Sequence, residues 1–195
     1  MTALAAALRR RSHSRVTAET PTHAELLALV EAASGVADHQ SLRPWRIIEL
    51  RGDSRIRLGE ALVAAASASA SASASASASA GAVVVDAAKL SAKPLRAELL
   101  LAVVVAVQPS EKVPAWEQEA AASGVAHLLS LLLDEAGWAV MWRSGPLTRS
   151  EQVAQVHELA ANERLLGWLY VGGMPERARG ERRDRIDPER FLSVL

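Results

Sequence analysis

The first residues that could do chemistry are arginines and serines in the stretch LRRRSHSR, residues 8–15. Guanidinium groups bind phosphates through charge-assisted hydrogen bonds, so one or two of these arginines, together with Ser12, could clasp a phosphate. The chain before them, residues 2–11, is predicted to form a helix, and cations at the C-terminal end of a helix also complement its dipole. The arginines of this stretch can therefore be interpreted in two ways: they bind a phosphate, or they complement the dipole at the C-terminal end of a helix.

Two later stretches place polar side chains next to predicted strands. In ADHQSLRPWR, residues 37–46, the polar residues lie between a helix end and a strand, where binding groups are often found. In MWRSGPLT, residues 141–148, a strand ends just before backbone amides that are free to meet a ligand. Either stretch could also be an ordinary turn, with Trp45 as a core residue in the first.

Several motifs of known catalytic sites are absent from the sequence. It contains no G-x-G-x-x-G and no Walker A loop, and its five histidines form no zincin pair. Ser144 lacks the preceding glycine of a nucleophile elbow. With no cysteine, a disulfide scaffold, a thiolate metal site and a cysteine nucleophile are excluded. We therefore expect no metal site and no hydrolytic nucleophile, and a reducing cytoplasm is the simplest location.

Length and charge narrow the class of protein further. A chain of 195 residues favours a single domain, residues 1–195, with room for a sizeable core. Lys plus Arg and Asp plus Glu both total 22, whereas a dedicated nucleic-acid binder is normally basic. No apolar run reaches the roughly 18–20 residues that would span a membrane. We expect a globular protein that binds neither nucleic acid nor membrane.

The elements that must position these residues alternate between helices and short strands. Helices are predicted at residues 2–11, 20–35, 55–66, 114–137 and 148–159, and strands at 44–50, 97–107, 138–143 and 164–173. Two capping boxes, Thr22 with Glu25 and Thr148 with Glu151, mark helix starts. This order predicts a mixed α/β layered fold of the α+β type.

The helix at residues 114–137 is predicted to be the longest of the chain. Pro114 suits its start and Gly137 its end. Its second half is apolar nearly all round, so both of its faces must be covered by protein.

A strict alternation of serine and alanine, residues 67–80, interrupts this pattern. Neither residue favours strands, and the tract offers little apolar surface to offset the entropy lost on ordering. We predict a mobile surface loop, with a helix that frays at its end as the alternative.

Taken in order, five segments resemble the nitroreductase family, and most closely its compact bacterial members. They are RRSHSR, DHQSLRPWR, KVPAWEQE, MWRSGPLT and LLGWLYVGG. The resemblance covers nearly the whole chain except the serine–alanine tract. It implies the nitroreductase-like fold, a central mixed or antiparallel sheet flanked by helices. It also implies a homodimer, formed through the long helix, with two FMN molecules in the subunit interface.

The resemblance also assigns roles to particular residues. Arg10, Arg11 and Ser12 would hold the FMN phosphate and ribityl chain, and His39 would approach the flavin bound mainly by the other subunit. From the end of the third strand, the residues lining the isoalloxazine or phosphate side would be Trp142, Arg143 and Ser144. Close relatives tend to have an arginine where this chain has Gly35, so one flavin contact would be missing.

The implied function is that of an FMN-dependent oxidoreductase. NAD(P)H would reduce the flavin, and a nitroaromatic, quinone or similar acceptor would then reoxidise it in a ping-pong cycle. No catalytic acid or base is expected among the side chains. Two alternatives remain: a flavin-binding protein for storage without turnover, and a nucleic-acid or partner-binding module that uses the arginines. The physiological acceptor and the choice between NADH and NADPH stay open, and the serine–alanine tract lies where relatives vary near the substrate opening.

Overall fold

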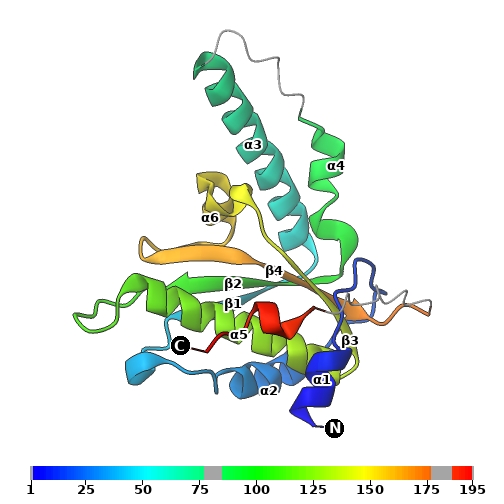
Figure 1. The fold of residues 1–195 in the computed structure, drawn as a ribbon. Coiled ribbons are helices and arrows are strands. Elements are labelled where there is room, and N and C mark those ends of the chain that lie inside the picture. Colours follow the sequence, from blue (N-terminus) through cyan, green and yellow to red (C-terminus); the bar gives the residue numbers. More distant parts are fainter. Residues whose placement is uncertain (1, 77–84, 177–185, 195) are drawn as a thin grey trace.

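The computed structural model describes residues 2–76, 85–176 and 186–194, and it is built around one antiparallel sheet (Figure 1). The strands of the described chain are β1 (Trp45–Leu50), β2 (Leu99–Ala106), β3 (Trp138–Arg143) and β4 (Glu163–Gly173), in the order β1-β2-β4-β3. The helices are α1 (Ala3–Arg9), α2 (His23–Ala33), α3 (Asp53–Ala76), α4 (Ala87–Ser91), α5 (Ala115–Glu135) and α6 (Glu151–Val156). All four predicted strands are confirmed, and so is the α+β fold.

The central strand β2 divides the core into two layers. Its side chains alternate between faces, as the twofold repeat of a strand requires. Leu99, Leu101 and Val103 pack in a cluster with α5, whereas Leu100 and Val104 pack in a second cluster with α3 and α6. Because both faces are covered by helices, the strand is continuously apolar.

Helix α5 crosses one face of the sheet, with α2 and α1 beside it (Figure 1). It begins after Pro114, whose extended backbone makes it the N-cap residue. It is followed by Gly137, whose φ of 92° lies in the region that glycine adopts easily. The predicted start and end of this helix are therefore confirmed.

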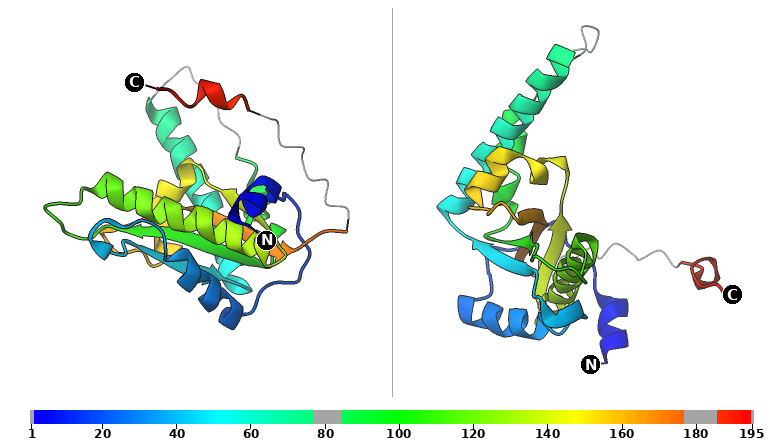
Figure 2. Two further views of the ribbon diagram at one scale, coloured as in Figure 1. Left: turned by 60° about the horizontal axis from the view of Figure 1, so that its bottom comes forward. Right: turned by 90° about the vertical axis from the view of Figure 1, so that its left-hand side faces the viewer.

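Helix α3 leaves the opposite face of the sheet and projects beyond it beside α4, as the two further views in Figure 2 also show. The two helices approach closely at Gly59, where an added Cβ would lie 2.5 Å from the carbonyl oxygen of Ser91. Glycine is therefore needed at this crossing, because a side chain there would push α4 away.

The predicted loop at residues 67–80 is wrong for its described part. Helix α3 runs without interruption from Asp53 to Ala76, so the helical alternative holds for residues 67–76, and residues 77–80 lie outside the described residues. Alanine has the highest helix propensity, and extending an existing helix costs far less than starting one. The tract follows a predicted helix directly, and that is the signal the loop prediction neglected.

The extension of α3 overturns the prediction that the helix at 114–137 is the longest. Helix α3 has 24 residues and α5 has 21. The predicted capping box at Thr148 is also wrong. The Ser150 hydroxyl caps α6 by accepting a bond from the amide of Val153, whereas the Thr148 hydroxyl donates to the carbonyl of Gly145 within a 3₁₀ turn.

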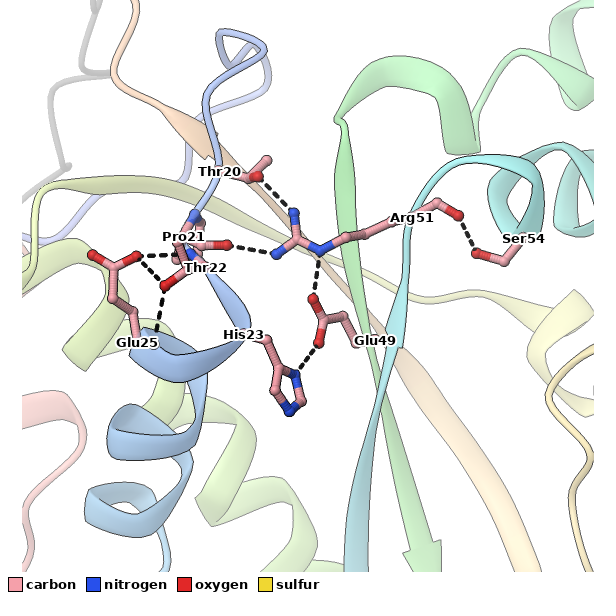
Figure 3. Close-up of polar contacts among 8 residues, drawn as sticks. All are labelled: Thr20, Pro21, Thr22, His23, Glu25, Glu49, Arg51 and Ser54. Carbon is pink, nitrogen blue, oxygen red and sulfur yellow. Dashed lines mark hydrogen bonds and ion pairs between the residues drawn. The ribbon is translucent and has the colours of Figure 1, made fainter.

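The capping box at the start of α2 is confirmed, and it belongs to a larger polar cluster (Figure 3). Thr22 and Glu25 satisfy each other's backbone amides at the helix start. Next to them, His23 Nδ1 lies 2.7 Å from Glu49 of β1, and the Arg51 guanidinium pairs with the same carboxylate and donates to the carbonyl of Pro21. This cluster anchors the start of α2 to the end of β1.

Candidate functional site

A cleft of about 490 Å³ lies at the end of β3, between the sheet and the base of α3. Its apolar and aromatic lining residues include Leu62, Leu90, Met141, Trp168 and Tyr170. The turn that follows β3 closes one side, with residues 144–148 in the wall. A cleft of this size with aromatic walls and a few polar groups is typical of a small-molecule site.

Positive charge dominates the polar part of the cleft. Lys93, Arg96 and Arg143 line it, and among the described residues that line it none is acidic. The Arg143 guanidinium carbon lies 5.3 Å from the centre of the Tyr170 ring, and its buried Nε has no hydrogen-bond partner among the described residues. A buried donor without a partner is costly, so this atom is suited to an acceptor on a ligand.

Trp168 and Tyr170 form the aromatic floor of the cleft, and a buried histidine holds Trp168 in position. Trp168 donates its indole N–H to Nε2 of His157 at 3.0 Å, while Nδ1 of the same ring donates to the carbonyl of Val153 at 2.7 Å. Burial lowers the pKa of His157, and the positive charge of Arg46 acts in the same direction. His157 is therefore neutral at ordinary pH, with the proton on Nδ1, and it holds Trp168 in place.

Tyr170 is the other aromatic residue of the floor. Burial raises the pKa of its hydroxyl, while the positive charges of Arg143 and Arg96 lower it. Because the pKa is raised overall, the hydroxyl is neutral at ordinary pH and is able to donate a hydrogen bond.

The arginines at the end of α1 have three different surroundings. Arg9 forms an ion pair with buried Asp134 of α5 at 3.1 Å. Arg11 folds back to donate to the carbonyls of Leu8, Arg9 and Arg10, which is the helix-end role considered above. The side chain of Arg10 has no hydrogen-bond or ion-pair partner among the described residues, so of these three it is the one free to bind a ligand.

The segment after α1 runs along the sheet next to the cleft. His13 donates its amide to the carbonyl of Val140, the residue directly before the part of β3 that lines the cleft. Further on, the amide of Thr17 donates to Gly173 at the end of β4. The predicted residues of α1 and of β3 therefore meet at one edge strand, with Ser12 exposed beside them.

The predicted residues Trp142 and Arg143 are the last two of β3, and Ser144 follows them directly. The Trp142 ring lies 5.0 Å from that of His127 on α5, and both Trp142 and Arg143 contribute to the lining of the cleft. A Cβ at Gly167 would lie 2.5 Å from the Trp142 indole nitrogen, so glycine allows this close packing. Ser144 and Gly145 are exposed at the mouth of the cleft.

His39 lies elsewhere in the same chain. Its Nδ1 is 2.9 Å from a carboxylate oxygen of Glu117, in the first turn of α5. Glu117 precedes His127 by ten residues, which is about 15 Å along the helix axis. The structure therefore brings together the predicted residues of α1 and β3 but leaves His39 well away from them within one chain.

The sequence interpretation missed Lys93, Arg96 and the aromatic floor. The signal was present, because KPLRAE, residues 93–98, places two cations directly before the buried strand β2. The order of the strands in the sheet could not be deduced from the sequence. The sequence therefore did not predict that this stretch lies close to the end of β3. Gly35 is exposed, and a Cβ at this position would meet only the Ala32 carbonyl, so the missing flavin contact stays a prediction.

Neither a metal-binding cluster nor a membrane-spanning helix occurs in the described part of the chain. Within residues 2–76, 85–176 and 186–194, no three histidine or acidic side chains are grouped so that they could hold a metal ion. No helix in the same ranges is long and apolar enough to cross a membrane.

The described chain is an α+β domain with an aromatic, cationic cleft at a sheet edge, and comparison with known proteins names its family. The chain belongs to the nitroreductase family, whose model matches residues 7–173. This confirms the resemblance of the five segments. Family membership supports the class of oxidoreductases.

Individual relatives agree with this assignment. The chain is 30% identical over 172 residues to the Escherichia coli K12 protein named "Putative NAD(P)H nitroreductase YdjA", covering 88% of each chain. Among solved structures, a nitroreductase-like family protein from Bacillus cereus matches with a TM-score of 0.79 at 20% identity, covering 100% of this chain and 97% of the other. The FMN- and NADPH-dependent nitroreductase NfnB from sphigopyxis sp. strain HMH matches with a TM-score of 0.72 at 18% identity, covering 100% and 99%.

Proposed function

We propose that the protein is an FMN-dependent oxidoreductase that uses NAD(P)H to reduce nitroaromatic, quinone or similar acceptors. The observation that carries this proposal is the cleft, with three cations, no acidic lining residue among those described, and the unpartnered Nε of Arg143. A planar aromatic ring bearing an anionic group is the kind of ligand that such a donor set fits. The names of the relatives supply the nitroreductase activity and the nicotinamide cosubstrate.

The residues that would hold FMN come from both sides of the sheet edge. Arg10 is the principal phosphate ligand, since Arg11 is occupied by carbonyls of its own helix end and orients the segment instead. Ser12 and Ser144 supply hydroxyls, and the backbone of Arg143 and the packed Trp142 form the wall beside the ring system. Lys93 and Arg96 place positive charge at the far side of the cleft.

The chain's contribution to the reaction is binding, orientation and electrostatics. FMN, held by these residues, would supply the ping-pong hydride-transfer chemistry between NAD(P)H and the acceptor. Lys93 and Arg96 would stabilise negative charge that develops in the ligand, an effect strengthened where water is excluded. The buried pair of Trp168 and His157 keeps the floor rigid, and no side chain is required as a catalytic acid or base.

The proposed site is completed by a second copy of the chain. Glu117, the partner of His39, lies about 15 Å along α5 from His127, whose ring contacts Trp142, so His39 is remote from the end of β3 within one chain. A symmetric dimer would bring the His39 of one copy to the cleft of the other. The half-buried leucines Leu128, Leu131 and Leu132 of α5 fit a partner that covers this helix.

Anaerobic stopped-flow mixing of the FMN-loaded protein with NADH and with NADPH tests the proposed turnover. Loss of the oxidised flavin absorbance with either nucleotide, followed by its return when a nitroaromatic or quinone is added, is expected. If the flavin spectrum stays oxidised with both nucleotides, the oxidoreductase function is overturned, and flavin storage without turnover becomes the better interpretation.

A further inference from the structure

The side chain of His39 is oriented by a carboxylate on another element. Its Nδ1 lies 2.9 Å from Oε2 of Glu117, a residue 78 positions later in the chain. The side chain of His39 is 55% exposed and that of Glu117 is 30% exposed, so the carboxylate is the more buried partner and the histidine reaches out from it. Nε2 of His39 has no hydrogen-bond partner among the described residues.

The loop that carries His39 has a strained backbone. Gln40, Ser41 and Arg43 have φ values of 62°, 52° and 47°, in the left-handed region that residues other than glycine rarely occupy. The loop is held by local bonds, since the Asp38 carboxylate accepts from the amide of Arg43 at 2.7 Å. Strain of this kind persists only where surrounding contacts impose it, and it is concentrated at functional sites.

A carboxylate bonded to one nitrogen of an imidazole fixes both the ring and its tautomer. With Glu117 accepting from Nδ1–H, the ring cannot turn freely and Nε2 is left facing outward. A surface ion pair by itself adds little to stability, so stability alone does not explain a strained loop that holds this contact.

We propose that Glu117 is a positioning residue that sets the orientation of His39, so that Nε2 meets the ligand bound in the cleft of a second copy of the chain. This inference rests on the proposed function, in which FMN occupies a site shared between two copies. Glu117 does not touch the ligand and acts only through the histidine. Replacing Glu117 should therefore weaken ligand binding only while His39 is present.

A double-mutant cycle on FMN affinity tests this dependence, using the full chain and fluorescence titration with FMN. His39→Ala and Glu117→Ala are each expected to weaken FMN binding by about tenfold, the scale of one charge-assisted hydrogen bond. The double variant is expected to bind no more weakly than His39→Ala, because the two residues act as one unit. Glu117→Gln, which still offers an oxygen to Nδ1–H, should retain most of the affinity.

Glu119 provides a matched control two residues further along α5. Its carboxylate pairs only weakly with exposed Arg149, at 3.4 Å, so Glu119→Ala should bind FMN as the unchanged chain does. Thermal unfolding of each variant separates a loss of affinity from a loss of folding.

The outcomes distinguish the inference from the function on which it rests. If His39→Ala weakens binding but Glu117→Ala does not, the positioning role of Glu117 is overturned and the shared site stands. If Glu117→Ala weakens binding equally with and without His39, Glu117 acts on the fold, and the inference is again overturned. If the unchanged chain binds no FMN, or His39→Ala has no effect, the shared flavin site fails and the inference fails with it.

Discussion

Neighbouring arginines at the end of α1 differ in what they are free to do. Arg9 pairs with buried Asp134, and Arg11 donates to three carbonyls of its own helix end. The Arg10 guanidinium has no partner among the described residues, and the segment that follows Arg10 pairs with β3, the strand that borders the cleft. Composition alone could not separate these roles, because the separation depends on where α1 lies against α5.

Arg10→Ala is therefore expected to weaken FMN binding by about 1–3 kcal/mol, the usual range for a hydrogen bond to a charged group. Equilibrium titration of the protein with FMN measures the change. Arg57→Ala, which removes an exposed arginine from α3, is the matched control and should leave the affinity unchanged. If the Arg10 variant and the control bind FMN with equal affinity, Arg10 is not a ligand of the FMN phosphate.

His157 should make stability depend on pH. Burial lowers its pKa in the folded protein, so its neutral form is favoured there, and this stabilisation is fully present above the pKa of the unfolded chain, about 6.5. As the pH falls below that value, the unfolded chain takes up a proton more readily, and the stabilisation is lost progressively. We predict that the unfolding temperature falls on acidification, with a shallower fall in His157→Phe.

Thermal unfolding of both proteins across this pH range tests the prediction. The variant will also be less stable at neutral pH, because the Trp168 N–H loses its acceptor, so the slopes rather than the absolute temperatures are compared. Parallel curves would show that His157 is not responsible.

At the scale of elements, the packing of α3 against α4 determines one wall of the cleft. Gly59 lets α4 approach until a Cβ would lie 2.5 Å from the Ser91 carbonyl. Lys93 and Arg96, which follow α4 in the chain, line the cleft. The position of both cations therefore depends on a glycine in a different helix.

Gly59→Ala should consequently destabilise the protein by about 1–3 kcal/mol, the usual cost of overpacking, and should weaken FMN binding as well. Gly124→Ala on α5 is the control, because its added methyl would meet Val36 at an ordinary 3.6 Å and would improve helix propensity. Chemical denaturation and FMN titration of both variants measure the two effects. A Gly59 variant as stable as the Gly124 variant would contradict the proposed close approach.

Most elements could be predicted from sequence, because periodicity and caps are local properties. The run of β-branched residues in β2 and the Thr22 capping box at α2 indicated their elements directly. The loop prediction was wrong for residues 67–76 of the serine–alanine tract because the composition of the tract was judged without the helix that precedes it. The site was harder, since Lys93, Trp168 and Arg143 converge only through the strand order β1-β2-β4-β3, which no local pattern specifies.

For the whole molecule, family membership and the cationic cleft both support the proposed FMN-dependent oxidoreductase. A chain with no net charge places a group of cations at one edge of the sheet, at the end of α1 and in the cleft. His39 stands apart from both, so the proposed role of His39 at the flavin requires a second copy of the chain. FMN binding by this chain is therefore the property on which the proposed function depends.

The visible spectrum of the 195-residue chain, incubated with FMN and then desalted, tests FMN binding most directly. We predict a yellow protein that retains one FMN per chain and releases it on denaturation. A protein that emerges colourless, with all of the FMN in the small-molecule fraction, would contradict the account.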